Sequence, residues 1–166
     1  MRPRFLADAM LGDVARWLRI LGEDCTFADP AWDDDGVLLA VQSEGRILVT
    51  RDLPLAARAR LLGVQVVAVP REGIENILAA VYAEAGSVPE ESRLATRCSL
   101  CNGALSSTDG QGAVRAALAF GKEPPHEEVL ARHSVFWSCG ACGQPYWRGT
   151  HWAPIEATRQ RVLARM

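Results

Sequence analysis

The sequence predicts an α/β fold in which helices flank a parallel sheet, followed by a small zinc ribbon. Two observations predict it. In the first half of the 166 residues, short β-rich runs alternate four times with amphipathic helical patterns, which is typical of a parallel sheet with helices on both faces. In the second half, two Cys-x-x-Cys pairs stand 37 residues apart, as in a zinc ribbon.

The strands and helices of the first half are predicted from local composition and from the glycines at the helix ends. Strands are expected at residues 4–7, 25–27, 46–50 and 64–69. The helical patterns after them begin near residues 10, 34, 54 and 74 and end at Gly22, Gly45, Gly63 and Gly86. In the first helix, Met10 is expected on the apolar face, and Arg16 and Arg19 on the polar face.

The chain is expected to divide into an α/β domain at residues 1–92 and a zinc ribbon at residues 93–166, with an inserted segment at about 105–133. Counted over these two parts, the first has nine basic and 15 acidic side chains (net −6), and the second has nine and five (net +4). This asymmetry suits a polyanion held by the ribbon and processed by the acidic part. An ordinary mixed surface explains the charges equally well.

Four cysteines carry the strongest signal: Cys98, Cys101, Cys139 and Cys142. A glycine follows each pair, and four such sulfurs are typical of a closed, structural zinc site. Two disulfides are the alternative. No signal peptide is visible, so we expect a cytoplasmic protein, in which a metal is favoured over disulfides. The fifth cysteine, Cys25, is expected to be a buried structural thiol.

Aspartates follow three of the predicted strands. Asp8 comes directly after the first strand, residues 33–35 after the second, and Asp52 after the third. The carboxyl ends of parallel strands meet at one edge of a sheet, so these carboxylates are expected to gather there. Clustered carboxylates repel one another unless a cation offsets their charge, and oxygen ligands favour Mg²⁺ or Mn²⁺. The pattern therefore predicts a metal-dependent hydrolytic site for a phosphodiester.

Helix capping explains part of the same pattern. Asp34 and Asp52 are both well placed as N-caps, for which aspartate is a favoured residue. Glu72 could supply a fourth carboxylate, but it also suits the first turn of a helix. Capping accounts less well for Asp8, which follows a buried strand directly.

Four segments resemble the Mut7-C family: residues 5–12 (FLADAMLG), 15–19 (ARWLR), 45–52 (GRILVTRD) and 146–152 (YWRGTHW). That family is regarded as a PIN-like nuclease domain followed by a zinc ribbon. The resemblance implies a PIN-like fold and a Mg²⁺- or Mn²⁺-dependent endoribonuclease. It implies metal-binding acids at Asp8, Asp52 and either Asp34 or Asp35, and it places Arg51 at the scissile phosphate or in a pair with these carboxylates.

The ribbon is expected to form strands near residues 135–137 and 146–147. Contacts to single-stranded RNA are expected from Arg16, Arg97, Arg132, Arg148, Arg159 and Trp147. The ribbon tryptophans could instead pack its small core. Two functions follow. One is a ribonuclease whose ribbon positions RNA, and the other is a non-catalytic RNA-binding or adaptor protein whose aspartates are helix caps.

Overall fold

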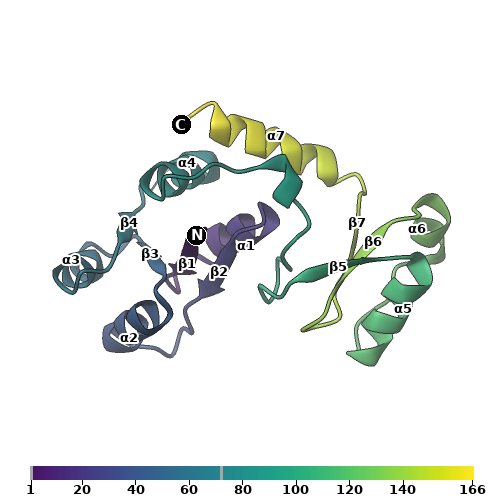
Figure 1. Ribbon diagram of the computed structural model, residues 1–166, viewed down its shortest axis with the longest axis horizontal. Coiled ribbons are helices and arrows are strands. Elements are labelled where there is room, and N and C mark those ends of the chain that lie inside the picture. Colours follow the sequence, from purple (N-terminus) through teal and green to yellow (C-terminus); the bar gives the residue numbers. More distant parts are fainter. Residues whose placement is uncertain (1, 72) are drawn as a thin grey trace.

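The computed structural model describes residues 2–71 and 73–166. Figure 1 shows the first half of the chain wound around one sheet, and a second, smaller sheet beside it with two further helices. The C-terminal helix returns across the top of the first half in this view. The α/β fold with a parallel sheet flanked by helices is therefore confirmed.

The larger sheet contains four parallel strands in the order β2-β1-β3-β4. Their bounds are Arg4–Ala7 (β1), Asp24–Phe27 (β2), Ile47–Thr50 (β3) and Val66–Ala68 (β4). All four residues of β3 are buried, as expected of a central strand with helices on both faces. The four strands lie where the sequence predicts them, within two residues at each end.

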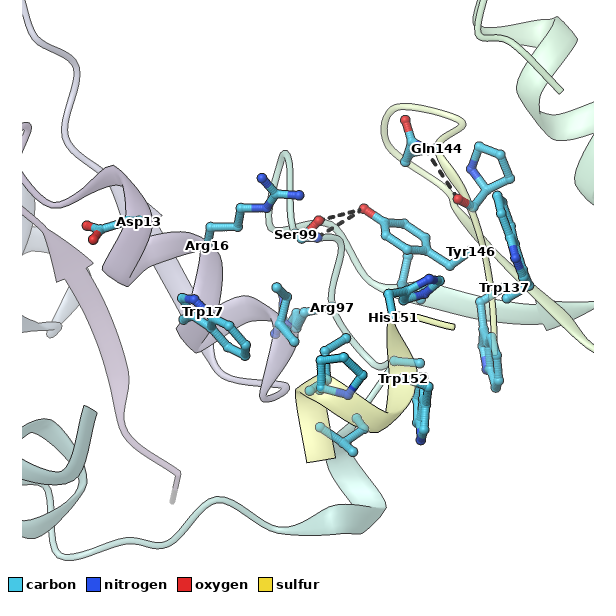
Figure 2. A pocket seen from close by; sticks show the side chains of 18 of the residues that line it. Asp13, Arg16, Trp17, Arg97, Ser99, Trp137, Gln144, Tyr146, His151 and Trp152 are labelled. Atoms are coloured by element: carbon cyan, nitrogen blue, oxygen red, sulfur yellow. Dashed lines mark hydrogen bonds between the residues drawn. The ribbon is translucent and has the colours of Figure 1, made fainter. Parts of the chain in front are cut away.

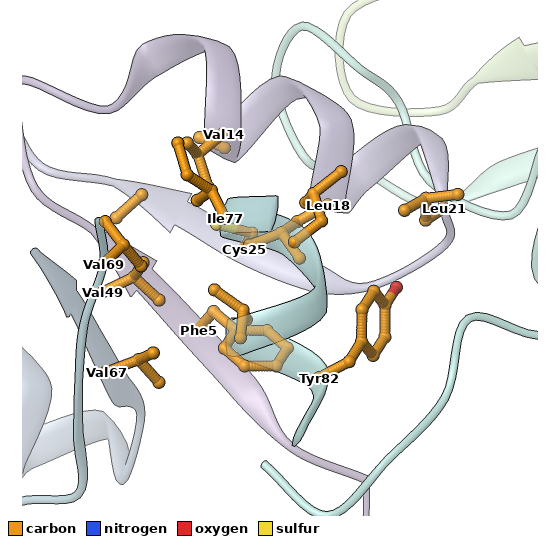
Figure 3. Close-up of a cluster of buried hydrophobic side chains, with 14 of the residues drawn as sticks. Phe5, Val14, Leu18, Leu21, Cys25, Val49, Val67, Val69, Ile77 and Tyr82 are labelled. Atoms are coloured by element: carbon orange, nitrogen blue, oxygen red, sulfur yellow. The ribbon is translucent and has the colours of Figure 1, made fainter. Parts of the chain in front are cut away.

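Helices cover both faces of this sheet. They are α1 (Gly12–Ile20) and α4 (Ile74–Glu84) on one face, and α2 (Asp34–Glu44) and α3 (Leu53–Leu61) on the other. Successive residues of a strand point to opposite faces of the sheet, so Phe5 packs against α1 and α4, whereas Leu6 packs against α2 and α3. Figure 3 shows the first core, in which Phe5 lies near Tyr82. Met10, predicted to be apolar core, precedes α1 and is 64% exposed.

The smaller sheet is antiparallel, in the order β5-β6-β7. Its strands are Leu105–Thr108 (β5), Phe136–Cys139 (β6) and Pro145–Trp147 (β7), and α5 (Gly110–Ala119) and α6 (Glu127–Arg132) lie between β5 and β6. The last two strands agree with the prediction. Strand β5 is not predicted by the sequence, and it lies at the start of the segment expected to be an insertion.

The chain returns to the larger sheet at its end. After the short 3₁₀ turn Glu91–Arg93 and the ribbon, α7 (Trp152–Leu163) packs against α4, and Val162 is buried in the core of the larger sheet. Arg159 was predicted to contact RNA, but it is 7% exposed and pairs with Glu156 at 2.6 Å. The domain division at residues 92 and 93 stays a prediction. Across the described residues, no helix has the length and apolarity that a membrane crossing requires.

Candidate functional site

Asp8 and Asp52 lie at the carboxyl ends of two adjacent strands, and Thr50 links them. The Thr50 hydroxyl donates to Asp8 Oδ2 at 2.7 Å and accepts from the Asp52 backbone N–H at 2.9 Å. Thr50 is fully buried and Asp8 is 8% exposed, so this chain of hydrogen bonds is shielded from solvent. The structure therefore connects the first and third predicted acids through a residue that the sequence did not single out.

Each of these two carboxylates uses one of its oxygens in a hydrogen bond within the protein. Asp52 is the N-cap of α3, and its Oδ1 accepts from the Leu55 N–H at 2.8 Å, as predicted for a cap. Asp8 uses Oδ2 for Thr50, which leaves Oδ1. Two such oxygens match the way proteins hold Mg²⁺, through one or two carboxylates with water and substrate phosphate as the other ligands. Carboxylate oxygens suit a hard divalent cation in their chemistry, but among the described residues the predicted aspartates do not form a group of three or more close metal ligands, as the cysteines do.

The aspartates after β2 are engaged elsewhere. The N-cap of α2 is Asp33, which accepts from the Gly36 N–H at 2.9 Å, and not Asp34 as predicted. Three consecutive aspartates can each cap a helix, so the sequence could not distinguish them. Asp34 and Asp35 both pair with Arg58 of α3, Asp34 at 2.9 Å. The fourth candidate acid, Glu72, lies outside the described residues.

Arg51 borders a shallow pocket beside Asp52. The pocket, of about 460 Å³, lies past the carboxyl ends of β3 and β4, and Arg71 lines it as well. The Arg51 Nε is buried and has no hydrogen-bond partner among the described residues. Arg51 forms no ion pair with Asp8 or Asp52 within that part of the chain.

The four predicted cysteines come together in the ribbon. Their sulfurs lie within 4.8 Å of one another, and Cys98 Sγ is 3.7 Å from Cys142 Sγ. Cys101 Sγ is 3.4 Å from Cys139 Sγ. A tetrahedral zinc site with bonds of about 2.3 Å would place its sulfurs about 3.8 Å apart. The cluster can hold a metal ion, and its geometry is consistent with zinc.

Tyr146 supports this cluster from β7. Its hydroxyl lies 3.1 Å from Cys98 Sγ and accepts from the Ser99 N–H at 3.1 Å. Burial opposes ionisation of Cys98, but the hydrogen bonds from Tyr146 and from the backbone outweigh it and lower the pKa of the thiol to about 7. Such an outer partner orients a metal ligand and stabilises its anionic form.

Cys25 stands apart from the cluster. It is fully buried in β2, and burial raises the pKa of its thiol to about 12. A thiol in that environment is neutral and inert. Cys25 is therefore the buried structural thiol that the sequence predicts.

The first cysteine loop docks against the edge strand β2. Arg19 donates to the Cys25 carbonyl at 2.7 Å and to the Leu100 carbonyl at 2.8 Å. Asn102, in the left-handed conformation at φ 68°, accepts from the Cys25 N–H at 3.0 Å and donates to Asp24 at 2.8 Å. Arg19, predicted on the polar face of α1, is thus 8% exposed. It joins the metal loop to the parallel sheet.

A cleft of about 910 Å³ lies where the two parts of the chain meet (Figure 2). Its walls come from α1, from the ribbon and from the start of α7. Three of the six predicted RNA-binding residues line it: Arg16, Arg97 and Trp147. A fourth, Arg148, has its Cζ 4.5 Å from the ring centre of Trp152. Arg132 and Arg159 do not line it. Figure 2 shows Arg16 and Trp17 on α1 facing Tyr146 and Trp137 of the ribbon.

A family model described as the Mut7-C RNAse domain matches residues 3–159. The chain belongs to this family. The match spans both the parallel sheet and the ribbon, so the two parts occur together in the family model. No curated protein and no solved structure matches the chain.

Membership of the Mut7-C family indicates a ribonuclease-like function, with RNA as substrate or partner. In this Mut7-C chain, the cysteine cluster lies in the ribbon, whereas Asp8 and Asp52 lie at the edge of the parallel sheet. The cluster of sulfurs and the strand-end carboxylates therefore lie at separate places in the fold. A closed set of four sulfurs is typical of structural zinc.

Proposed function

We propose that this protein is an endoribonuclease that hydrolyses RNA phosphodiesters with Mg²⁺ or Mn²⁺ at the Asp8–Asp52 edge. The observation that carries the proposal is the buried link from Asp8 through Thr50 to Asp52 at the carboxyl ends of adjacent strands, in a member of an RNAse-domain family. Parallel α/β sheets bind their ligands at this edge.

The residues at this edge have distinct roles in the proposal. Thr50 fixes the orientation of Asp8 and the backbone of Asp52, so that their free oxygens are held for one cation. When bound, a divalent ion lowers the pKa of a water molecule and offsets negative charge on the phosphate. Arg51, whose Nε has no protein partner among the described residues, contacts the phosphate.

Asp34 is the third acid of the proposal, and Asp35 is its alternative. The side chain of Asp34 is 48% exposed, against 80% for Asp35, and both pair with Arg58. Arg58 offsets the charge of these two acids only in part, because one cation faces two carboxylates. Substrate or cation binding would have to compete with this pair for the Asp34 carboxylate.

A non-catalytic RNA-binding protein is the second candidate function. The observation that favours it is that each aspartate after β2 and β3 has a structural partner. Asp33 and Asp52 cap helices, while Asp34 and Asp35 pair with Arg58. In that case the carboxylate edge needs no cation, and the RNA is bound without being cut.

Cleavage of labelled single-stranded RNA by the zinc-loaded protein tests the two candidates. The arms are no added ion, Mg²⁺, Mn²⁺ and EDTA, with the zinc content of the protein measured after each. The variants are Asp8→Asn and Asp52→Asn. Asp109→Asn is the matched control, because Asp109 caps α5 in the ribbon as Asp52 caps α3.

We expect cleavage only with Mg²⁺ or Mn²⁺, a loss of at least 100-fold in Asp8→Asn and Asp52→Asn, and no loss in Asp109→Asn. Thr50→Val should lower the affinity for Mn²⁺, measured by calorimetry, while Thr50→Ser should retain it. If folded protein binds RNA but leaves it uncut in every arm, the nuclease proposal fails and the binding protein is favoured.

A further inference from the structure

We propose that the cleft between α1 and the ribbon binds unpaired bases of single-stranded RNA and so sets where the strand is cut. The part of this proposal that concerns the position of the cut rests on the proposed function, whereas the part that concerns RNA binding does not. The cleft is lined by Arg16 and Trp17 from α1, by Trp137 and Tyr146 from the ribbon, and by Trp152 from α7.

The shape and surface of the cleft suit flat aromatic ligands. At about 910 Å³ it lies within the range of pockets that enclose organic ligands of drug size. Its tryptophan and tyrosine side chains are half-buried, so each keeps part of its ring accessible. Trp137 and Trp152 lie nearly parallel, at 11° with ring centroids 6.2 Å apart. Aromatic rings on such walls stack bases of any identity.

The charges around the cleft suit a phosphate backbone. Arg16 is exposed and makes no ion pair or hydrogen bond within residues 2–71 and 73–166. On the opposite side, Arg148 is exposed, and its guanidinium lies over the Trp152 ring. Arg97 is already held by Asp24 at 3.4 Å and by the Asn102 carbonyl at 3.0 Å, so it contributes positive potential from a fixed position. Cations beside stacking rings are the usual combination in single-strand binding.

The cleft and Asp8 both adjoin the start of α1. Gly12 and Asp13 line one end of the cleft, and the Leu11 N–H just before them donates to the Asp8 carbonyl at 2.8 Å. A strand whose bases lie in the cleft can therefore continue past the start of α1 to Asp8. Because Ala7, next to Asp8, and Val14 of α1 pack in one core, the cut is expected at a constant number of nucleotides from the bound bases.

This arrangement also selects unpaired RNA. In a duplex, the bases are stacked on one another and their faces are closed to protein rings, whereas unpaired bases can be splayed onto aromatic side chains. The occupant to which the proposal commits is thus single-stranded RNA. A peptide would be the occupant if binding ignored the bases.

Fluorescence anisotropy with a labelled single-stranded RNA, without divalent ion, measures binding separately from cleavage. The variants are Trp137→Ala, Trp137→Phe and Arg16→Ala. Phe120→Ala and Arg115→Ala are matched controls, since both residues are exposed in the ribbon and neither lines the cleft. The RNA arms are the single strand, its duplex, and single strands with one abasic position moved along the sequence.

We expect Trp137→Ala to weaken single-strand binding about tenfold and Trp137→Phe to retain most of it. Arg16→Ala should reduce the slope of log affinity against log salt by about one phosphate contact. Duplex binding should be weak and unchanged in all variants. The proposal is overturned if the cleft variants bind like their controls, or if abasic positions have no effect anywhere in the strand.

Cleavage of the abasic series separates this inference from the proposed function. Abasic positions at one fixed distance from the cut should reduce cleavage. If the protein binds through the cleft but never cuts, the nuclease proposal fails and the cleft assignment stands. If cutting depends on Asp8 but Trp137→Ala and Arg16→Ala cut and bind normally, the cleft assignment fails and the nuclease proposal stands.

Discussion

Replacing Arg19 with methionine should destabilise the zinc-loaded protein by about 3 kcal/mol. Arg19 is 8% exposed, and its two short hydrogen bonds join α1 to the Cys25 carbonyl at 2.7 Å and to the Leu100 carbonyl at 2.8 Å. A hydrogen bond from a charged donor contributes about 1.5–3 kcal/mol. Methionine keeps the packing of the side-chain stem but leaves both carbonyls without this donor, and relief of the buried charge offsets part of the loss.

Urea unfolding followed by tryptophan fluorescence measures this change. Arg16→Met is the matched control, because Arg16 lies on the same helix, is exposed and has no partner within the described part of the chain. We expect the control to change the free energy of unfolding by less than about 0.5 kcal/mol. If Arg19→Met is as mild as Arg16→Met, the docking of the cysteine loop on β2 does not stabilise the protein.

Four other predictions concern the metal, the pH dependence of stability and one turn. Cys98→Ser should lower the zinc content from about one ion per chain to almost none by mass spectrometry of metals, and unchanged zinc would contradict a four-sulfur site. Burial raises the pKa of Glu23, so the folded state favours its protonated form and its contribution to stability falls as the pH rises above the usual value of about 4.3. Glutamine cannot ionise, so the wild type should lose unfolding free energy relative to Glu23→Gln as the pH rises. Burial alone would raise the pKa of Asp24, but hydrogen bonds from two side chains lower it. The contribution of Asp24 to stability is therefore lost as the pH falls below about 3.9, and the wild type should lose unfolding free energy relative to Asp24→Asn in that direction. Gly22→Ala should lower the free energy of unfolding by more than about 2 kcal/mol, because φ is +85° and the new Cβ would lie 2.2 Å from a backbone oxygen. Gly86→Ala is the control: its φ is +61° but its Cβ would meet open space, so it should lower the free energy of unfolding by only about 1 kcal/mol in the same urea assay.

The parallel sheet could be predicted best at its central strand β3, which is buried on both faces. A run such as residues 47–50 is apolar or β-branched throughout and is fully covered, so its composition alone marks it as a central strand. Strand β5 carries a different signal. Its residues Leu105–Thr108 are largely polar and accessible, and it is held mainly by backbone pairing with β6, which composition does not report.

Of the candidate site, the sequence could predict only the residues that come just after strands. Asp8 follows β1 directly and Asp52 comes two residues after the end of β3, so their common edge follows from a parallel sheet. The role of Thr50 depends on β1 and β3 being neighbours in register, with Ala7 opposite Val49, which is a tertiary fact. Arg19 has helical spacing that suits a solvated face, and only the docking of the ribbon buries it.

The return of α7 to the larger sheet means that the ribbon is attached at both of its ends. The 3₁₀ turn Glu91–Arg93 precedes it, and α7, anchored by Val162, follows it. If zinc were removed, the ribbon would become a closed loop and not a free tail, so its four cysteines would stay at high effective concentration near one another and near β2. Metal loss should therefore be reversible within the folded protein, and refilling the cysteine cluster should restore docking without any refolding of the parallel sheet.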